Sequence, residues 1–114
     1  MIEQVMIDYL ENELDGVHAF AEVPEEHYEK MVIVDKTGSS LSNRIYSVTV
    51  AVQSYAESLL QAAALNEIVK SAVLRMTALD VISSVRLNSD YNYTDTQSKR
   101  YRYQAVFVIT YLEV

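Results

Sequence analysis

Residues 46–79 read YSVTVAVQSYAESLLQAAALNEIVKSAVLRMTAL, and the spacing of apolar side chains changes inside this stretch. Over its first eight residues apolar and polar side chains alternate, which is the pattern of a half-buried β-strand. Ser54 and Glu57 then match the S-x-x-E capping box that opens a helix. The alanine- and leucine-rich segment that follows has helical spacing as far as about Ala78. The expected core side of this helix consists of Leu65, Ile68, Val69, Ala72, Val73, Met76 and Leu79.

The sequence before this stretch predicts one helix and two strands. Apolar residues at offsets 0, 3, 4, 7, 8 and 12 from Ile2 indicate a helix, which we expect to end where Gly16 adopts a left-handed conformation. Residues 17–23 alternate weakly and stop at Pro24, which indicates a short strand. The continuous apolar run at residues 31–34 is typical of a strand buried on both faces.

Two polar segments are expected to form exposed connections. Turn-forming residues begin at Thr37, so we expect a hairpin with a polar tip from Thr37 to Asn43. After the long helix the chain alternates again, and the polar segment at residues 94–99 separates two further strands. The expected common face of the first of these strands carries Val85, Leu87, Tyr91 and Tyr93. The last strand, residues 101–112, has one apolar and one mixed face.

The order helix, strand, strand, strand, helix, strand, strand predicts an α+β fold. We expect a single domain over residues 1–114, with a mainly antiparallel sheet of about five strands and two helices packed on one face. Only the crossover through the second helix is expected to join parallel strands.

Composition excludes several classes of protein. Sixteen acidic and nine basic residues give a net charge of −7, which disfavours binding to nucleic acid. The absence of cysteine excludes disulfides and thiolate metal sites. No run approaches the ~20 apolar residues of a membrane span, and the first residues lack the basic segment of a signal peptide. We therefore expect a soluble protein that binds no membrane and is not exported by the general route.

The charge is unevenly distributed along the chain. Residues 1–57 hold 11 acids and 3 bases, whereas residues 58–114 hold 5 acids and 6 bases. An acidic half and a mildly basic half could meet head to tail between copies of the chain. A solvated acidic face is the alternative explanation.

Residues with catalytic potential are sparse. Glycine occurs only at positions 16 and 38, which excludes the glycine-rich loops that cradle phosphates. His18 lies in a predicted strand, where a hydrogen-bonded structural histidine is the common case. His27 is surrounded in sequence by Glu25, Glu26 and Glu29. This acidic loop could bind a hard cation, or it could simply be exposed to solvent. We expect no enzymatic activity and no catalytic, cofactor or metal site, and a metal at this loop would reverse that expectation.

Tyrosine is the most unusual feature of the composition, since the chain has nine tyrosines and no tryptophan. Tyrosine suits a half-wet sheet face or a protein interface. Arg100 and Arg102 are close in sequence to several of them and add the other residue type enriched at binding hot spots. Cross-strand aromatic pairs that hold the last hairpin together are an equally good explanation.

Several segments resemble a known family: 32–40 (VIVDKTGSS), 52–59 (VQSYAESL), 65–69 (LNEIV), 87–96 (LNSDYNYTDT) and 101–111 (YRYQAVFVITY). Together they are similar to small tail proteins of long-tailed bacteriophages and prophages of Gram-positive bacteria, of the tail-terminator or tail-completion family. The resemblance spans nearly the whole chain in order. It contains no catalytic signature.

The resemblance implies a subunit that forms a homo-oligomer, usually a hexameric ring, on the head-proximal end of the tail tube. Such a ring stops tail polymerisation and contacts the tail tube protein and a head or neck completion protein. The protein would be made in the bacterial cytoplasm and reside in the virion. Candidate assembly-interface residues are Glu25, Glu26, Glu29, Thr37, Ser39, Ser40, Tyr91, Tyr93, Lys99, Arg100 and Arg102.

Two other functions fit the same sequence. One is a head-completion or neck adaptor protein of the same virion. The other is a non-viral binding module that uses the tyrosine-rich sheet face for a peptide or small ligand.

Overall fold

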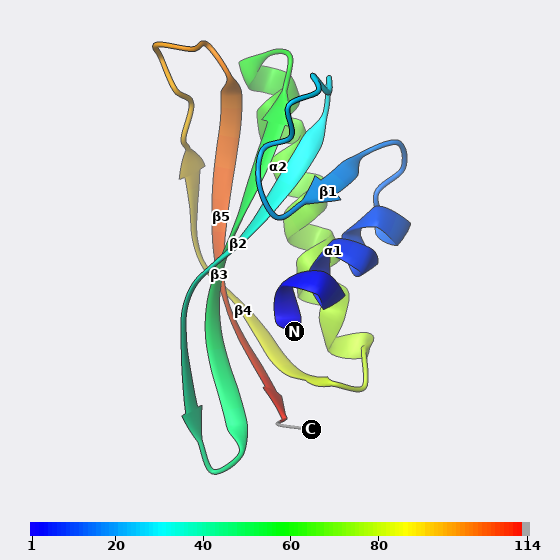
Figure 1. Ribbon diagram of the computed structural model, residues 1–114, viewed down its shortest axis with the longest axis vertical. Helices are drawn as coiled ribbons and strands as arrows, with labels where there is room; N and C mark the ends of the chain where they lie inside the picture. Colours follow the sequence, from blue (N-terminus) through cyan, green and yellow to red (C-terminus); the bar gives the residue numbers. More distant parts are fainter. Residues whose placement is uncertain (113–114) are drawn as a thin grey trace.

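A five-stranded sheet with both helices on one side forms the molecule, and the computed structural model describes residues 1–112 (Figure 1). The elements are α1 (Ile2–Glu13), β1 (His18–Phe20), β2 (Met31–Ser42), β3 (Ile45–Ala56), α2 (Leu59–Leu74), the 3-10 helix η1 (Arg75–Ala78), β4 (Ile82–Asn92) and β5 (Tyr101–Leu112). The strands lie in the order β1-β2-β3-β5-β4. The predicted α+β class, the element order and the one-sided helix layer are confirmed.

The only parallel pair in the described sheet is β1 with β2, in which His18 lies beside Met31. These strands are joined by residues 21–30 without a helix, so the expectation that only the α2 crossover joins parallel strands is wrong. The α2 crossover connects β3 to β4, but β5 lies between them and is antiparallel to both.

The first helix and strand end earlier than predicted. Leu14 follows α1 in an extended conformation and buries its side chain in the core, so the helix ends at Glu13. Gly16 does have a positive φ of 70°, but in the turn beyond the helix. The Ala19 N–H donates to a Glu11 carboxylate oxygen at 2.8 Å, and the chain leaves the sheet after Phe20.

The predicted polar tip at residues 37–43 is wrong, because Thr37, Ser39 and Ser40 lie within strand β2. The turn is made by Asn43 and Arg44, both with positive φ. This is the two-residue hairpin geometry that follows the twist of the strands. The small polar residues before the turn are exposed, so alternation of apolar side chains could not reveal their strand.

Helix α2 begins four residues later than the capping box predicts. Strand β3 continues to Ala56, and the N-cap is Ser58, whose Oγ accepts from the Gln61 N–H at 3.2 Å. Ser54, the predicted cap, is a fully buried strand residue, and its Oγ has no hydrogen-bond partner among residues 1–112.

Two serine variants separate the observed cap from the predicted one. We expect Ser58→Ala to lower the free energy of unfolding by about 1 kcal/mol, because one N-terminal N–H loses its partner. Ser54→Ala should leave stability unchanged or raise it, because it removes a buried hydroxyl that has no partner. Urea unfolding of both variants measures the difference. A larger loss of stability for Ser54→Ala than for Ser58→Ala would indicate that Ser54 is the N-cap after all.

The main core lies between the helices and the sheet. Its centre combines Met6 and Leu10 of α1 and Val69 of α2 with Val50 of β3 and Phe107 of β5, all fully buried. Most of the predicted helical core side is confirmed. Ile68 is the exception, since it is 58% exposed on the far side of α2.

A bulge in β4 changes which side chains share a face. The register shifts between Leu87 and Ser89, so Val85 and Leu87 face the helices, whereas Tyr91 pairs with Gln104 on the opposite face. The predicted common face of Val85, Leu87, Tyr91 and Tyr93 is therefore wrong. An alternating sequence cannot reveal the extra residue of a bulge.

The same bulge turns Asp90 toward α2. Its carboxylate accepts from Asn66 Nδ2 and from Lys70 Nζ, both at 2.9 Å. The Lys70 hydrogen bond is the main reason why the pKa of Asp90 lies below its usual value. A lowered folded-state pKa means that this carboxylate stabilises the fold above its ordinary pKa of about 3.9, and that the contribution disappears as the pH falls.

We expect Asp90→Asn to lower the free energy of unfolding at pH 7 by about 0.5–1 kcal/mol, a modest figure because the pair is partly solvated. Since the wild-type advantage requires the ionised carboxylate, the difference should shrink as the pH falls below about 4. The control is Glu67→Gln, which removes the second, 71% exposed carboxylate beside Lys70. Urea unfolding at several pH values tests this, and a difference that grows at low pH would contradict it.

Candidate functional site

The side of the sheet that faces away from both helices, here called the open face, is the most extensive candidate surface. The β3–β5 register places Thr49 beside Val108, Ala51 beside Val106, and Gln53 beside Gln104 on this side. Val106 and Val108 are half-buried, and Ala51 is buried by its neighbours. The part of the open face on β3 and β5, here called its centre, is thus neutral and lined by small or β-branched side chains. On β2, the exposed Asp35 lies beside Ala51 and adds a carboxylate at the border of this centre.

One end of the open face carries a continuous hydrogen-bonded cluster, the polar belt, made of Gln53, Tyr55, Tyr91, Tyr93, Arg102 and Gln104. Gln53 Nε2 donates to Gln104 Oε1 at 2.8 Å, and Gln104 Nε2 donates to the Tyr91 hydroxyl at 2.6 Å. The Tyr55 hydroxyl donates to Gln53 Oε1 at 3.3 Å. The belt therefore crosses β3, β5 and β4, and its side chains hold one another in place.

Arg102 closes the belt. Its Nη1 donates to the Tyr55 hydroxyl and its Nε to the Tyr93 carbonyl, both at 2.7 Å. Its guanidinium lies 4.6 Å from the ring centre of Tyr93, and that of Arg100 lies 5.1 Å from the ring centre of Tyr55. Arg102 forms no ion pair among residues 1–112, so a fixed cation is presented between aromatic rings.

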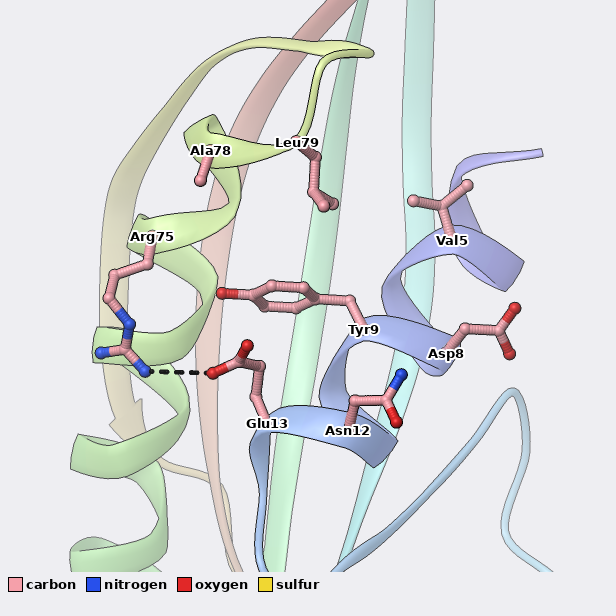
Figure 2. A pocket seen from close by; sticks show the side chains of 8 residues that line it. All are labelled: Val5, Asp8, Tyr9, Asn12, Glu13, Arg75, Ala78 and Leu79. Carbon is pink, nitrogen blue, oxygen red and sulfur yellow. Dashed lines mark ion pairs between the residues drawn. The ribbon is translucent and has the colours of Figure 1, made fainter.

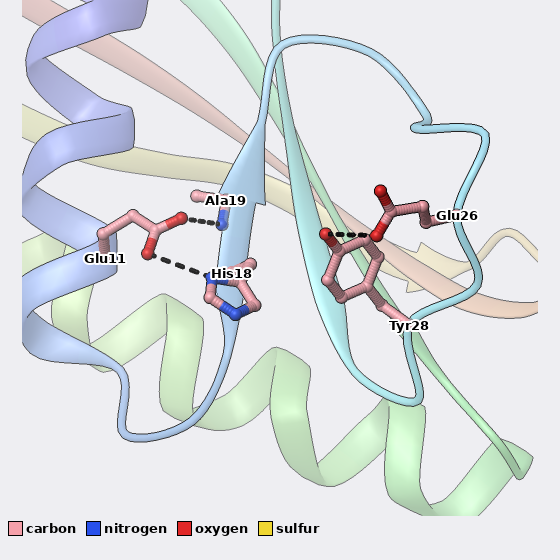
Figure 3. Close-up of polar contacts among 5 residues, drawn as sticks. All are labelled: Glu11, His18, Ala19, Glu26 and Tyr28. Atoms are coloured by element: carbon pink, nitrogen blue, oxygen red, sulfur yellow. Dashed lines mark hydrogen bonds and ion pairs between the residues drawn. The ribbon is translucent and has the colours of Figure 1, made fainter.

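Residues 21–30 cover the neighbouring corner of the open face. Tyr28 packs with Phe20 over the buried side chains of Met31, Ile33 and Tyr55. Tyr28 also donates to Glu26 at 3.5 Å, as Figure 3 shows.

Both histidines contact exposed carboxylates. His18 Nδ1 lies 3.4 Å from Glu11, the residue that also accepts from Ala19 (Figure 3). His27 Nε2 lies 2.9 Å from Glu57, which connects the acidic loop to the end of β3. Among residues 1–112, no group of three acidic or histidine side chains is arranged to hold a metal ion.

The loop at residues 94–99 is ordered by Asp95. Its carboxylate accepts from the Gln97 N–H at 3.0 Å and from the Ser98 hydroxyl at 2.9 Å, and Lys99 has a positive φ. The Ser98 hydrogen bond is the main cause that lowers the pKa of Asp95. Lys99 is therefore held at a defined turn beside the belt.

The structure brings together only part of the predicted interface. Tyr91, Tyr93, Arg100 and Arg102 meet at the polar belt, with Lys99 in the adjoining turn. Glu25, Glu26 and Glu29 lie on the exposed loop at the β1–β2 side of the same end. Thr37, Ser39 and Ser40 lie on the half of β2 that leads to the hairpin turn, away from both groups.

Sequence reasoning missed Gln53, Tyr55 and Gln104. Gln53 and Gln104 occupy the polar positions of two alternating segments, and their pairing becomes visible only when the strands are aligned. The alternation of polar and apolar residues in the two segments was the signal that could have placed both glutamines on the open face.

A groove of about 640 Å³ lies between α1 and the 3-10 helix η1, on the helix side (Figure 2). Three of its polar side chains have partners: Glu13 pairs with Arg75 at 3.6 Å, and the Tyr9 hydroxyl donates to the Ala72 carbonyl at 2.6 Å. Burial is the main cause that raises the pKa of Tyr9.

The fold and this surface define a two-layer α+β domain with an uncovered, preorganised sheet face. No helix in the described part of the chain is long and apolar enough to span a membrane. Comparison with protein-family models gives no match, and comparison with curated proteins gives none either.

Proposed function

We propose that this chain is a structural subunit of a bacteriophage tail, which assembles as a ring on the head-proximal end of the tail tube. The ring ends tail polymerisation and joins the tail to the head or neck. The observation that carries the proposal is that the two outer layers of the molecule present different surfaces, an exposed apolar stripe on α2 and an uncovered sheet face on the other side. The resemblance of the sequence to tail-terminator proteins supplies the biological setting.

The first apolar surface is the outer stripe of α2, defined as Leu60, Ala64, Ile68, Ser71 and Leu74. All five residues are exposed, and Leu60 is 83% exposed. Only Glu67 and Lys70 are charged among the 16 residues of α2. A helix that is apolar on every side is usually covered by another element, so the outer stripe favours assembly.

The second surface is the neutral centre of the open face, on the opposite side of the molecule. Contacts between two non-identical surfaces are heterologous, and they form a ring when the rotation between copies closes. The two surfaces therefore support a head-to-tail ring more directly than a two-fold dimer.

The shape of the molecule suits one partner above and one below such a ring. The principal extents are 44 × 25 × 24 Å. The β2–β3 hairpin projects past the helices at one end of the long axis, and the β4–β5 connection lies at the other end (Figure 1). We assign these two ends to the tail tube protein and the head or neck completion protein.

Electron microscopy of tail tubes tests the proposal. Tubes of the tail tube protein from the same virus are assembled with the gold-labelled chain, and the label is expected at one end of each tube, together with arrested growth at that end. Label along the tube wall, or no label on tubes, would overturn the terminator function. Label on isolated head connectors alone would identify a neck adaptor instead.

The polar belt favours a second candidate, a non-viral binding module. Its fixed arginine, amides and tyrosine rings are groups that bind a peptide through hydrogen bonds and aromatic contact. This function needs no self-association. A chain that remains monomeric and binds an extended peptide at the belt would support this alternative.

A further inference from the structure

We propose that the side chains of Arg100 and Arg102, here called the arginine pair, bind carboxylates on residues 21–30 of a neighbouring copy. An acidic loop of one subunit and a basic turn of the next would then join the two. The inference rests on the proposed function, because it specifies one contact between copies in the ring. It concerns only the end of the molecule that carries the polar belt.

Arg102 is a cation that is fixed in place and still has hydrogen-bond donors to spare. Its Nε donates to the Tyr93 carbonyl and its Nη1 to the Tyr55 hydroxyl, both at 2.7 Å. A guanidinium carries five N–H groups, so three of them, including both on Nη2, have no partner among residues 1–112. Because the side chain is already held, binding a carboxylate costs it little conformational freedom.

Arg100 adds a second cation at the same place. Its guanidinium lies 5.1 Å from the ring centre of Tyr55, and that of Arg102 lies 5.6 Å from the same centre. Neither arginine, nor Lys99 beside them, forms an ion pair in the part of the chain that the structure describes. The carboxylate of Asp95 accepts from groups of its own loop instead. Two guanidinium groups on one ring without a counter-charge favour an anionic partner.

The acidic loop, residues 21–30, supplies a partner of the required charge. It contains one base, Lys30, and four carboxylates, those of Glu22, Glu25, Glu26 and Glu29. All four acids are exposed, and none pairs with a lysine or an arginine among residues 1–112. The loop is held on the molecule, since Tyr28 packs with Phe20 and His27 Nε2 lies 2.9 Å from Glu57. Its carboxylates are therefore displayed on a positioned segment.

The places of the loop and the turn allow a repeated contact. Residues 21–30 and the β4–β5 connection both lie in the upper half of Figure 1, with the loop to the right of the connection. Copies placed side by side in the same orientation bring the acidic loop of one toward the basic turn of the next. The two surfaces differ, so the contact is heterologous and can continue around a ring. A contact between two acidic loops, or between two basic turns, would bring like charges together.

Two charge-reversal variants of the chain test the inference. The loop variant carries Glu25→Lys and Glu29→Lys, and the turn variant carries Arg100→Glu and Arg102→Glu. Each variant alone is expected to associate at least ~10-fold more weakly than the wild type, because like charges then meet at the contact. The loop variant makes the net charge of −7 less negative, so general repulsion between copies cannot explain its loss.

Matched controls change the charge by the same amounts elsewhere. One control carries Asp8→Lys and Asp80→Lys, and the other carries Arg44→Glu and Arg75→Glu, all at exposed positions outside the loop and the turn. Both controls should associate like the wild type. Circular dichroism establishes that every variant is folded.

Arg102 also holds the polar belt together, so a second turn variant separates binding from folding. Lys99→Glu combined with Arg100→Glu leaves both side-chain hydrogen bonds of Arg102 in place. This variant should again associate more weakly than the wild type.

The decisive sample is an equimolar mixture of the loop variant and the first turn variant. In the mixture the new lysines of one variant meet arginine-site glutamates of the other, and the unchanged acids meet the unchanged arginines. Light scattering should therefore give the wild-type mass for the mixture, although neither variant reaches it alone. Wild-type association should also weaken as the salt rises from about 0.05 M to about 0.5 M, because salt screens the attraction between the two segments.

Several results would overturn the inference, and they separate it from the proposed function. Variants that associate like the wild type, controls that lose as much as the variants, or a mixture that does not recover reject the pairing, while a ring can still form through another contact. Association that strengthens with salt rejects it too. A wild-type chain that stays monomeric also rejects it, and the tube-end experiment then decides the proposed function independently.

Discussion

Replacing Phe107 with alanine is expected to lower the free energy of unfolding by about 3–5 kcal/mol. Phe107 is fully buried on the interior strand β5, between Val50 of β3 and Leu87 of β4. The helices close the core above it, so the neighbouring side chains can only partly fill the space that the ring leaves. Because domains of this size are stable by about 5–15 kcal/mol, the loss is a large part of the total.

The adjacent Val108 is the matched control. It lies on the same strand but points to the open face and is only half-buried, so Val108→Ala should cost less than about 1.5 kcal/mol. Urea unfolding measures both variants at constant m-value. Similar losses for the two variants would contradict the assignment of the core to the helix side of β5.

Tyr55→Ala is expected to cost about 3 kcal/mol and to release residues 21–30 from the sheet. Tyr55 is only 4% exposed, although it lies on the side of the sheet that has no helix. Its ring packs with Met31 and Ile33 beneath Phe20 and Tyr28, and its hydroxyl accepts from Arg102. One substitution therefore disrupts both the second hydrophobic cluster and the polar belt.

Tyr55→Phe separates these two contributions. It keeps the ring and removes only the hydroxyl that Arg102 and Gln53 contact, so we expect a loss of about 1 kcal/mol. Hydrogen exchange should be faster in residues 21–30 for Tyr55→Ala and almost unchanged for Tyr55→Phe. Equal exchange in the two variants would show that the ring does not hold this loop.

The order of helices and strands could be predicted because the spacing of apolar residues in each element reflects which of its sides is buried. The alternation in β3 and β5 and the helical spacing in α1 and α2 reflect one buried side per element, which leaves a direct trace in the sequence. The residues at which helices and strands end could not be predicted in this way. Ser54 and Ser58 both begin a capping-box pattern, and pairing of β3 with β5 as far as Ala56 selects the second serine.

The candidate surface depended on contacts that are distant in sequence. Tyr91 lies on the open face because of the bulge in β4, and Gln53 lies beside Gln104 because of the β3–β5 register. Exposed Leu60 and Ile68 were visible in the sequence as apolar residues of an alanine-rich helix. Their outward position could be recognised only once the core side of α2 was established.

The mass of the purified chain as a function of concentration tests the central claim, self-association into a ring, most directly. Light scattering is expected to show a species near six times 13.0 kDa as the concentration rises. A mass of 13.0 kDa at every concentration up to about 1 mM would contradict self-association.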